Sequence, residues 1–349
     1  MVPVAVQGFR SIRGHAEAVA LLRRAINHDR VASVYLFNGP QGVGKERVAI
    51  ALAQAMNCEA VDRAAPDLDA CGVCTGCKRL ASGRHADLIT LQRPLKEPKE
   101  EDLARWRYGR IEEIPEAELK QEIVVEQIEE LVARMPFRPN EGGTRWVIVR
   151  EADRMNTTVS NKLLKTLEEP PQGTHFVLLT HRPSALLATV RSRCQVLRFG
   201  LLDEADVTAV LQGLALDAES VARVAPLADG SVGRALGFLD GEELLRRRAF
   251  VDELLAALRE RQSLVGTFTE RGEQAKSLDR GDLVASLSLL LRHFRAEAVG
   301  AAANGRLAAV HAARADVVRE TLEALDGGAP LNPQLLVQAM LVRLREVRA

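Results

Sequence analysis

The chain has 349 residues, which is too long for one ordinary domain and predicts two or three. Its 47 lysine and arginine residues balance 47 aspartate and glutamate residues, which argues against a protein that coats nucleic acid through bulk positive charge. Hydrophobic residues make up 47% of the chain, as in folded globular proteins, and the 4% of aromatic residues disfavours a stacking surface for single-stranded bases. Arginine outnumbers lysine by 39 to 8, so any single arginine is weak support for a functional site.

The N-terminal residues lack the basic start and apolar run of a signal peptide. No apolar stretch approaches the roughly 18 residues that a membrane-spanning helix needs. We therefore expect a cytoplasmic protein with no membrane contact. In that compartment, clustered cysteines are expected to bind a metal rather than to form disulfides.

Short apolar runs alternate with helical patterns over the first 200 residues. Apolar residues recur at helical spacing in residues 16–28, 48–55, 123–135 and 156–169. Five apolar runs predict buried strands, at residues 33–37, 87–91, 146–149, 176–180 and 195–199. This alternation predicts an α/β fold in which helices flank a parallel sheet. The charged stretch at 94–122, which contains two prolines, predicts a solvated surface loop, with binding of a partner as the alternative.

The alternating pattern stops near Gly200, and beyond it apolar residues recur at helical spacing only. We expect an α/β domain over residues 1–200 that contains a cysteine module at 58–77. A small helical domain is expected over 201–241 and a larger helical domain over 242–349.

A glycine-rich loop follows the first predicted strand. Gly39, Gly42, Gly44 and Lys45 complete the pattern G-x-x-x-x-G-K, in which backbone N–H groups and a helix N-terminus surround phosphates. The next residue of this pattern is normally Ser or Thr, whose hydroxyl binds Mg²⁺. Here it is Glu46, whose carboxylate would face the negative charge of the polyphosphate.

The third predicted strand carries a second departure. In an ATPase of this class that strand ends in Asp-Glu, which hold Mg²⁺ and polarise water. Here it runs into Arg150 and Glu151, so a positive charge stands at the Mg²⁺ position. These changes predict that the chain does not hydrolyse ATP by itself. They leave open whether ATP or ADP still binds or whether the loop is only a tight turn.

Four of the five cysteines lie close together in the sequence. Cys58, Cys71, Cys74 and Cys77 include two C-x₂-C steps that share Cys74, a spacing that suits tetrahedral Zn²⁺. Four sulfur ligands leave no open coordination position, so the predicted zinc is structural. The alternative is four reduced cysteines without a metal.

These motifs together resemble the clamp-loader branch of the AAA+ family, which serves bacterial DNA polymerase III. The resemblance extends over most of residues 5–240, and its most specific parts are the string Asn161–Pro171 and the tripeptide Ser192-Arg193-Cys194. It implies a RecA-like AAA+ domain, a small helical lid domain, and a helical collar domain through which five subunits form a ring. The last hundred residues match the collar only in being helical.

The resemblance also implies roles for single residues. Arg193 falls in the arginine-finger motif and would act in trans on ATP held by a neighbouring subunit. The alternative is that Arg193 is one more solvated arginine. Thr180 falls at the first sensor position. The second sensor arginine would fall at Gly233, and Arg234 lies one place further on, which agrees with weak or absent ATP chemistry.

The sequence thus predicts a clamp-loader subunit similar to the family members that do not hydrolyse ATP. Its partners would be tau/gamma ATPase subunits and a delta subunit in a pentameric ring that loads the sliding clamp onto primed DNA. An active ATPase of the tau/gamma kind is the first alternative, and the changes at Glu46 and Arg150 argue against it. A zinc-bearing interaction scaffold unrelated to replication is the second, and the string at 163–171 disfavours it.

Overall fold

The computed structural model describes residues 6–97, 119–141, 143–239, 241–259, 280–326 and 332–347. The chain divides into two compact units, Met1–Leu236 and Gly237–Ala349. The first unit contains all the strands of the described residues, and the second consists of helices. Among the described helices, none is both long and apolar enough to cross a membrane.

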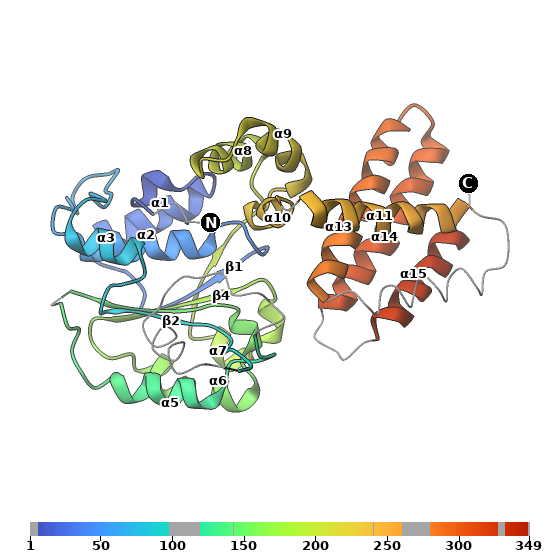
Figure 1. The fold of residues 1–349 in the computed structure, drawn as a ribbon. Helices are drawn as coiled ribbons and strands as arrows, with labels where there is room; N and C mark the ends of the chain where they lie inside the picture. Colours follow the sequence, from blue (N-terminus) through green and yellow to red (C-terminus); the bar gives the residue numbers. More distant parts are fainter. Residues whose placement is uncertain are drawn as a thin grey trace. The chain divides into compact units, whose positions relative to one another are not determined.

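A five-stranded parallel sheet forms the centre of the first unit (Figure 1). In chain order the strands are β1 (Val34–Asn38), β2 (Leu88–Leu91), β3 (Arg145–Val149), β4 (Thr174–Thr180) and β5 (Gln195–Arg198). Their order in the sheet is β2-β3-β4-β1-β5, and all four pairings are parallel. The carboxyl ends of the strands therefore meet at one edge of the sheet and the amino ends at the opposite edge. The two edges carry the two groups of polar residues described below.

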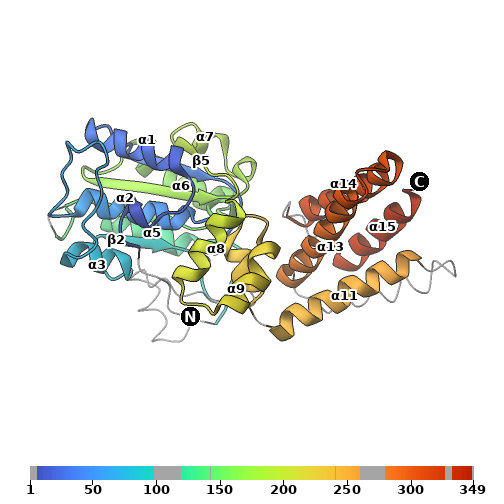
Figure 2. The same ribbon diagram turned by 90° about the horizontal axis from the view of Figure 1, so that it is seen from above.

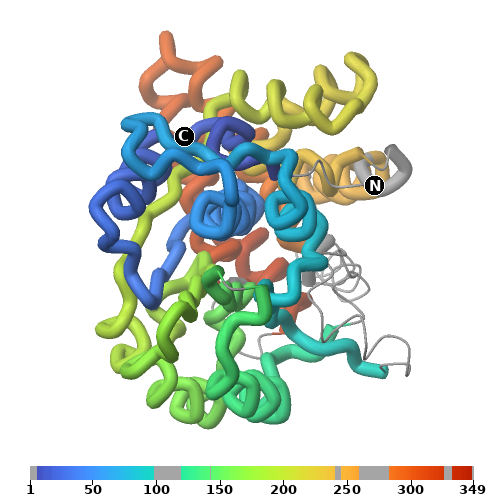
Figure 3. Tube along the Cα trace, turned by 90° about the vertical axis from the view of Figure 1, so that its left-hand side faces the viewer, coloured from blue at the N-terminus to red at the C-terminus, as the bar shows by residue number. Residues whose placement is uncertain are grey.

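Helices cover both faces of the sheet (Figures 1 and 3). α1 (Ala16–Asn27) and α2 (Lys45–Asn57) lie on one face, and α5 (Val125–Arg134) and α6 (Thr157–Glu168) on the other. Side chains alternate along β3, so Trp146 and Ile148 pack with α1 and α2 while Val147 and Val149 pack toward α5 and α6. All four are fully buried, as expected for a parallel strand covered on both faces.

Three short helices follow the sheet: α8 (Glu204–Gly213), α9 (Ala218–Val224) and α10 (Val232–Gly237), whose last residue is the first of the second unit. Asp203 and Asp217 begin α8 and α9, because each side chain accepts a hydrogen bond from the backbone N–H three residues on. A single-turn 3₁₀ helix, η5 (Ala225–Ala228), precedes α10. The first turn of α10 contacts the glycine-rich loop, so this helical segment and the loop form one site.

The second unit contains α11 (Gly241–Arg259), α13 (Arg280–Gly300), α14 (Gly305–Asp326) and α15 (Pro333–Glu346). A short turn joins α13 to α14, and the two helices pack side by side (Figure 2). The core of the unit is apolar and includes Leu287, Leu290, Phe294, Val318 and Leu341. α15 packs on both α11 and α14, which makes the unit a small helical bundle.

The predicted fold class, a parallel α/β sheet domain followed by helices, is confirmed. All five predicted strands are present with ends within two residues of the prediction. The short helices α3 (Thr75–Ala81) and α7 (Ala188–Arg191) were not predicted, because each is too short to show a helical period. Most of the charged stretch at 94–122 lies outside the described residues. At its described ends, Leu95 and Leu119 form an isolated antiparallel bridge.

Candidate nucleotide site and metal centre

The glycine-rich loop joins the carboxyl end of β1 to α2 and is held by its own chain. Ser231 donates its hydroxyl hydrogen to the Gln41 carbonyl at 2.8 Å, and the Gly233 N–H donates to the Gly42 carbonyl at 3.0 Å. On the other side, Nε2 of His15 donates to the Val43 carbonyl at 2.8 Å. Three consecutive carbonyls of the loop are therefore bound by α1 and α10.

Gly42 and Gly233 touch backbone to backbone. Gly42 has φ +73°, and a Cβ there would lie 2.5 Å from the Ser231 hydroxyl. A Cβ on Gly233 would lie 2.8 Å from the Cα of Gly42, closer than real side chains approach. The position at which the family resemblance places a sensor arginine therefore has no room for a side chain. Arg234, one residue on, turns away and pairs with Asp229 at 3.0 Å.

Lys45 is almost completely buried and points back into the loop. Its Nζ donates to the Gly39 carbonyl at 2.7 Å and to the Pro40 carbonyl at 2.6 Å. Burial lowers the pKa of Lys45 to about 8, and the negative charge of Asp153 partly opposes this shift. The amine that would reach the phosphates of a nucleotide is thus already hydrogen-bonded to the loop itself.

At the positions that would bind Mg²⁺, the side chains of Glu46 and Arg150 bind each other instead. Nε of Arg150 donates to both carboxylate oxygens of Glu46 at 2.9 Å, and Nη2 donates to one of them at 2.7 Å. Nη1 of Arg150 donates to Oε1 of Gln92 at 2.6 Å. Only 18% of the Arg150 side chain and 24% of the Glu46 side chain are exposed, so water screens the pair weakly. The guanidinium supplies the positive charge that a cation would supply between these two elements.

Glu151, at the position of the water-polarising glutamate, is also paired. It follows Arg150 in the left-handed region, with φ 45° and ψ 52°. Its carboxylate accepts a hydrogen bond at 2.7 Å from Nε of Arg93, a residue that is 2% exposed. Gln92 and Arg93 follow β2, and Arg150 and Glu151 follow β3. The two strands are neighbours, so all four residues lie at the same sheet edge.

Thr180 ends β4 at this edge, and its hydroxyl is used internally. It donates to Oδ1 of Asp153 at 2.7 Å and accepts from the Arg182 N–H at 3.0 Å. The Arg182 guanidinium donates to Oδ2 of Asp153 at 3.0 and 3.2 Å. The predicted first sensor residue is thus part of a closed network around a buried aspartate.

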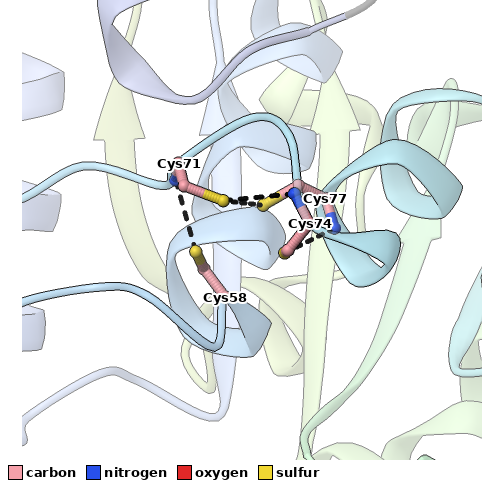
Figure 4. Close-up of side chains that lie close together, drawn as sticks. All are labelled: Cys58, Cys71, Cys74 and Cys77. Carbon is pink, nitrogen blue, oxygen red and sulfur yellow. Dashed lines mark hydrogen bonds between the residues drawn. The ribbon is translucent and has the colours of Figure 1, made fainter.

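The four clustered cysteines come together as one site (Figure 4). Their sulfur atoms all lie within 4.8 Å of one another, and no other group of at least three Cys, His or acidic side chains in the described chain is arranged to hold a metal. Cys58 follows the end of α2, and Cys74 begins α3, where its sulfur accepts from the Cys77 N–H at 3.4 Å. Four thiols at this separation fit a tetrahedral Zn²⁺, whose Zn–S bonds are about 2.3 Å.

The backbone around the cluster favours thiolate at one position. N–H groups of Cys74 and Val73 donate to Sγ of Cys71 at 3.3 and 3.4 Å, and they lower the pKa of Cys71 to about 6. Burial raises the pKa of Cys58 and Cys77. Thiols with raised pKa values ionise when a cation replaces their protons, so the buried pair is suited to a bound metal rather than to free thiolates.

The cysteine module is tied to the N-terminal segment. Nε2 of the fully buried Gln54 donates to the carbonyls of Val6 and Cys77, both at 2.8 Å, and its Oε1 accepts from the Gly8 N–H. The Asp69 carboxylate accepts from the N–H groups of Phe9 and Arg10 at 2.6 and 2.8 Å. A metal here would therefore stabilise the end of α2, the start of α3 and the residues before α1.

Arg193 lies at the opposite edge of the sheet. It stands two residues before β5, and β5 runs parallel to β1, whose carboxyl end carries the glycine-rich loop. A four-residue strand separates the two edges by about 10 Å. Nη1 of Arg193 donates to the Thr189 carbonyl at 2.7 Å, and Nη2 pairs with Glu168. Arg193 is thus directed away from the chain's own loop.

Several residues of these networks were not identified from the sequence: His15, Gln92, Arg93, Asp153 and Glu168. A signal existed for Arg93, because it follows a predicted strand as Glu151 does, and adjacent parallel strands end at the same edge. No local pattern marks His15 or Asp153, because their partners lie far away in the chain. Glu168 lies in the string Asn161–Pro171 that carries the family resemblance, but its pairing was not predicted from the sequence.

The sheet covered on both faces, with G-x-x-x-x-G-K between β1 and α2, defines a P-loop α/β protein. The family described as DNA polymerase III, delta subunit, matches residues 14–203, more than half of the chain. The chain therefore belongs to the DNA polymerase III delta subunit family, within the clamp-loader AAA+ proteins.

The curated proteins that this chain resembles include delta' subunits and tau subunits. The delta' subunit of Pseudomonas aeruginosa DNA polymerase III is 34% identical over 163 residues, 47% of this chain and 42% of that protein. The tau subunit of Escherichia coli is 28% identical over 366 residues, 98% of this chain and 51% of that protein. This chain spans about half the length of the curated relatives that it matches. A gamma subunit-related protein from Thermotoga maritima aligns with 94% of this chain and 99% of its own, at 16% identity and TM-score 0.43.

We expect freshly purified, reduced protein to contain one zinc per chain, because four sulfurs converge and no other ligand set competes among the described residues. Cys74→Ser should lose most of the metal and lower the Tm. Cys194→Ser is the matched control, since Cys194 lies outside the cluster and should leave the zinc content at one. Metal analysis that finds no zinc in the unaltered chain would contradict the prediction.

The Arg150–Glu46 pair should contribute to folding stability. Replacing one partner leaves a largely buried charge without its ion-pair partner, so Arg150→Met and Glu46→Gln should each destabilise the chain. A double-mutant cycle in urea should give a coupling energy of about 1–2 kcal/mol, between the values for exposed and buried pairs. Strictly additive effects would show that the two side chains do not interact in solution.

Proposed function

We propose that this chain is a delta prime-like clamp-loader subunit that does not hydrolyse ATP. In this proposal it sits in a pentameric ring with tau/gamma ATPase subunits and a delta subunit, and the ring loads the sliding clamp onto primed DNA. Its own contribution to ATP chemistry is Arg193, presented to the ATP of a neighbouring subunit. Family membership supports the setting and argues against a scaffold unrelated to replication.

The observation that carries the proposal is the Arg150–Glu46 pair. Hydrolysis needs a cation between the phosphate loop and the end of the third strand. Here a guanidinium and a carboxylate neutralise one another at that place, and Glu151 is paired with Arg93. A Mg²⁺ ion would meet a fixed positive charge, and no free carboxylate would polarise the attacking water. The altered loop accordingly serves as a structural turn, with or without ADP bound.

The position of Arg193 supports action in trans. The residue lies at the amino edge of the sheet, and its own loop lies at the carboxyl edge. A guanidinium placed against a neighbour's γ-phosphate stabilises the charge that develops as the bond to the leaving group breaks. Arg193 is partly exposed, with 32% of its side chain accessible, so it can reach a partner without unfolding of the chain.

An active ATPase of the tau/gamma kind is the second candidate. Tau subunits match nearly the whole of this chain, which favours it. The two candidates differ in the behaviour of the isolated chain. We expect no ATP turnover above background from the isolated chain with Mg²⁺, because its cation position is filled by Arg150. Turnover that disappears in Lys45→Ala would instead support the tau/gamma candidate.

Arg193→Ala should lower the DNA-stimulated ATPase of the reconstituted complex at least tenfold, because arginine fingers contribute about 10³–10⁵ in kcat in the best-studied cases. Arg191→Ala is the matched control, since Arg191 is an exposed arginine two residues away. Both variants should assemble, and Arg193→Ala should lower the Tm only slightly, because its ion pair with Glu168 is partly exposed. Equal ATPase rates for the two variants would remove the role proposed for Arg193.

A further inference from the structure

Arg193 does not extend freely into solvent in this chain. Its guanidinium is folded back on the end of α7, where Nη1 donates to the Thr189 carbonyl and lies 3.5 Å from the Ser192 hydroxyl. Nη2 forms an ion pair with Glu168, the last residue of α6. Two of its five N–H groups, on Nε and Nη2, have no partner among the described residues. The guanidinium is thus hydrogen-bonded to its own chain through only some of its N–H groups.

The surroundings explain why it folds back. Carbonyls at the C-terminal end of a helix carry partial negative charge, and a carboxylate placed there is unfavourable unless a cation accompanies it. Glu168 stands at such an end, and the Thr189 carbonyl lies in the last turn of α7. Arg193 compensates both helix ends at once. The carboxylate is the one full negative charge among its three contacts.

We propose that Glu168 is a positioning residue that holds Arg193 on its own chain and competes with the neighbour's nucleotide for it. This inference rests on the proposed function of Arg193. The ligand that displaces Glu168 is the terminal phosphate of a nucleoside triphosphate. Because a phosphate carries more negative charge than a carboxylate, the guanidinium exchanges one anion for another when a triphosphate-bearing neighbour docks, and it returns when the phosphate leaves.

The negative charge of Glu168 determines how its replacement changes the attraction of Arg193 for phosphate. A carboxylate beside the guanidinium cancels part of its attraction for phosphate, so removing that charge strengthens the engaged state. The pair is partly exposed, with 32% of the Arg193 side chain and 47% of the Glu168 side chain accessible. Exposed pairs of this kind correspond to about twofold to fivefold in an equilibrium constant.

The test compares Glu168→Gln with Glu169→Gln in the reconstituted complex. Glu169 is the next residue, is exposed and lies at the same helix end, so both changes remove one negative charge from one place. The ATPase rate is measured against MgATP concentration. Glu168→Gln should lower the KM for ATP about twofold to fivefold with kcat unchanged. Glu169→Gln should match the unaltered chain, and the difference in KM should shrink as salt rises.

Glu168→Asp is the second variant, because it keeps the charge and shortens the reach by one methylene group. It should lower the KM less than Glu168→Gln does. An unchanged or raised KM in Glu168→Gln, or an equal fall in Glu169→Gln, would overturn the inference. Arg193→Ala in the same assay distinguishes failure of the role proposed for Arg193 from failure of the inference about Glu168. If Arg193→Ala has no effect, the proposed function fails. If Arg193→Ala lowers the ATPase but the glutamate variants behave like the unaltered chain, the inference alone fails.

Discussion

The contact between Arg150 and Glu46 determines what the rest of the carboxyl edge can do. The parallel sheet brings the start of α2 and the end of β3 together, so charged side chains at positions 46 and 150 either attract or repel one another. A hydroxyl and an aspartate there would leave a net negative site that attracts a cation. A glutamate and an arginine leave a neutral one, held by three hydrogen bonds between the two side chains.

The polar groups next to that pair also have partners inside the chain. Arg93 binds Glu151, Arg182 and Thr180 bind Asp153, and Lys45 binds carbonyls of its own loop. Each of these groups would be costly to bury without a partner, because buried charges need compensation. The contact between Gly42 and Gly233 then brings α10 directly onto the loop. Among the described residues, the charged side chains named here thus form a polar network in which each has a partner inside the chain.

The sequence predicts the parts that depend on short-range pattern. Apolar runs located all five strands, and the cysteine spacing located the four sulfurs that converge in space. The two unusual residues, Glu46 and Arg150, were identified singly. Their direct pairing was not, because 104 residues separate them in the chain. The pairing of Glu168 with Arg193 is similar, because β4 and α7 lie between these two residues in the chain.

The two edges of the sheet place arginine in two different environments. Arg150 is largely buried and has three acceptor atoms at fixed distances, so exchanging its partner would require opening the site. Arg193 is more exposed, and two of its N–H groups have no partner in the part of the chain that the structure describes. A guanidinium stays charged in either place, so its mobility depends on burial and on the number of its partners. The same fold thus places a largely buried arginine at one edge and a more exposed arginine at the other. On the proposed function, only the second is available to a neighbouring subunit.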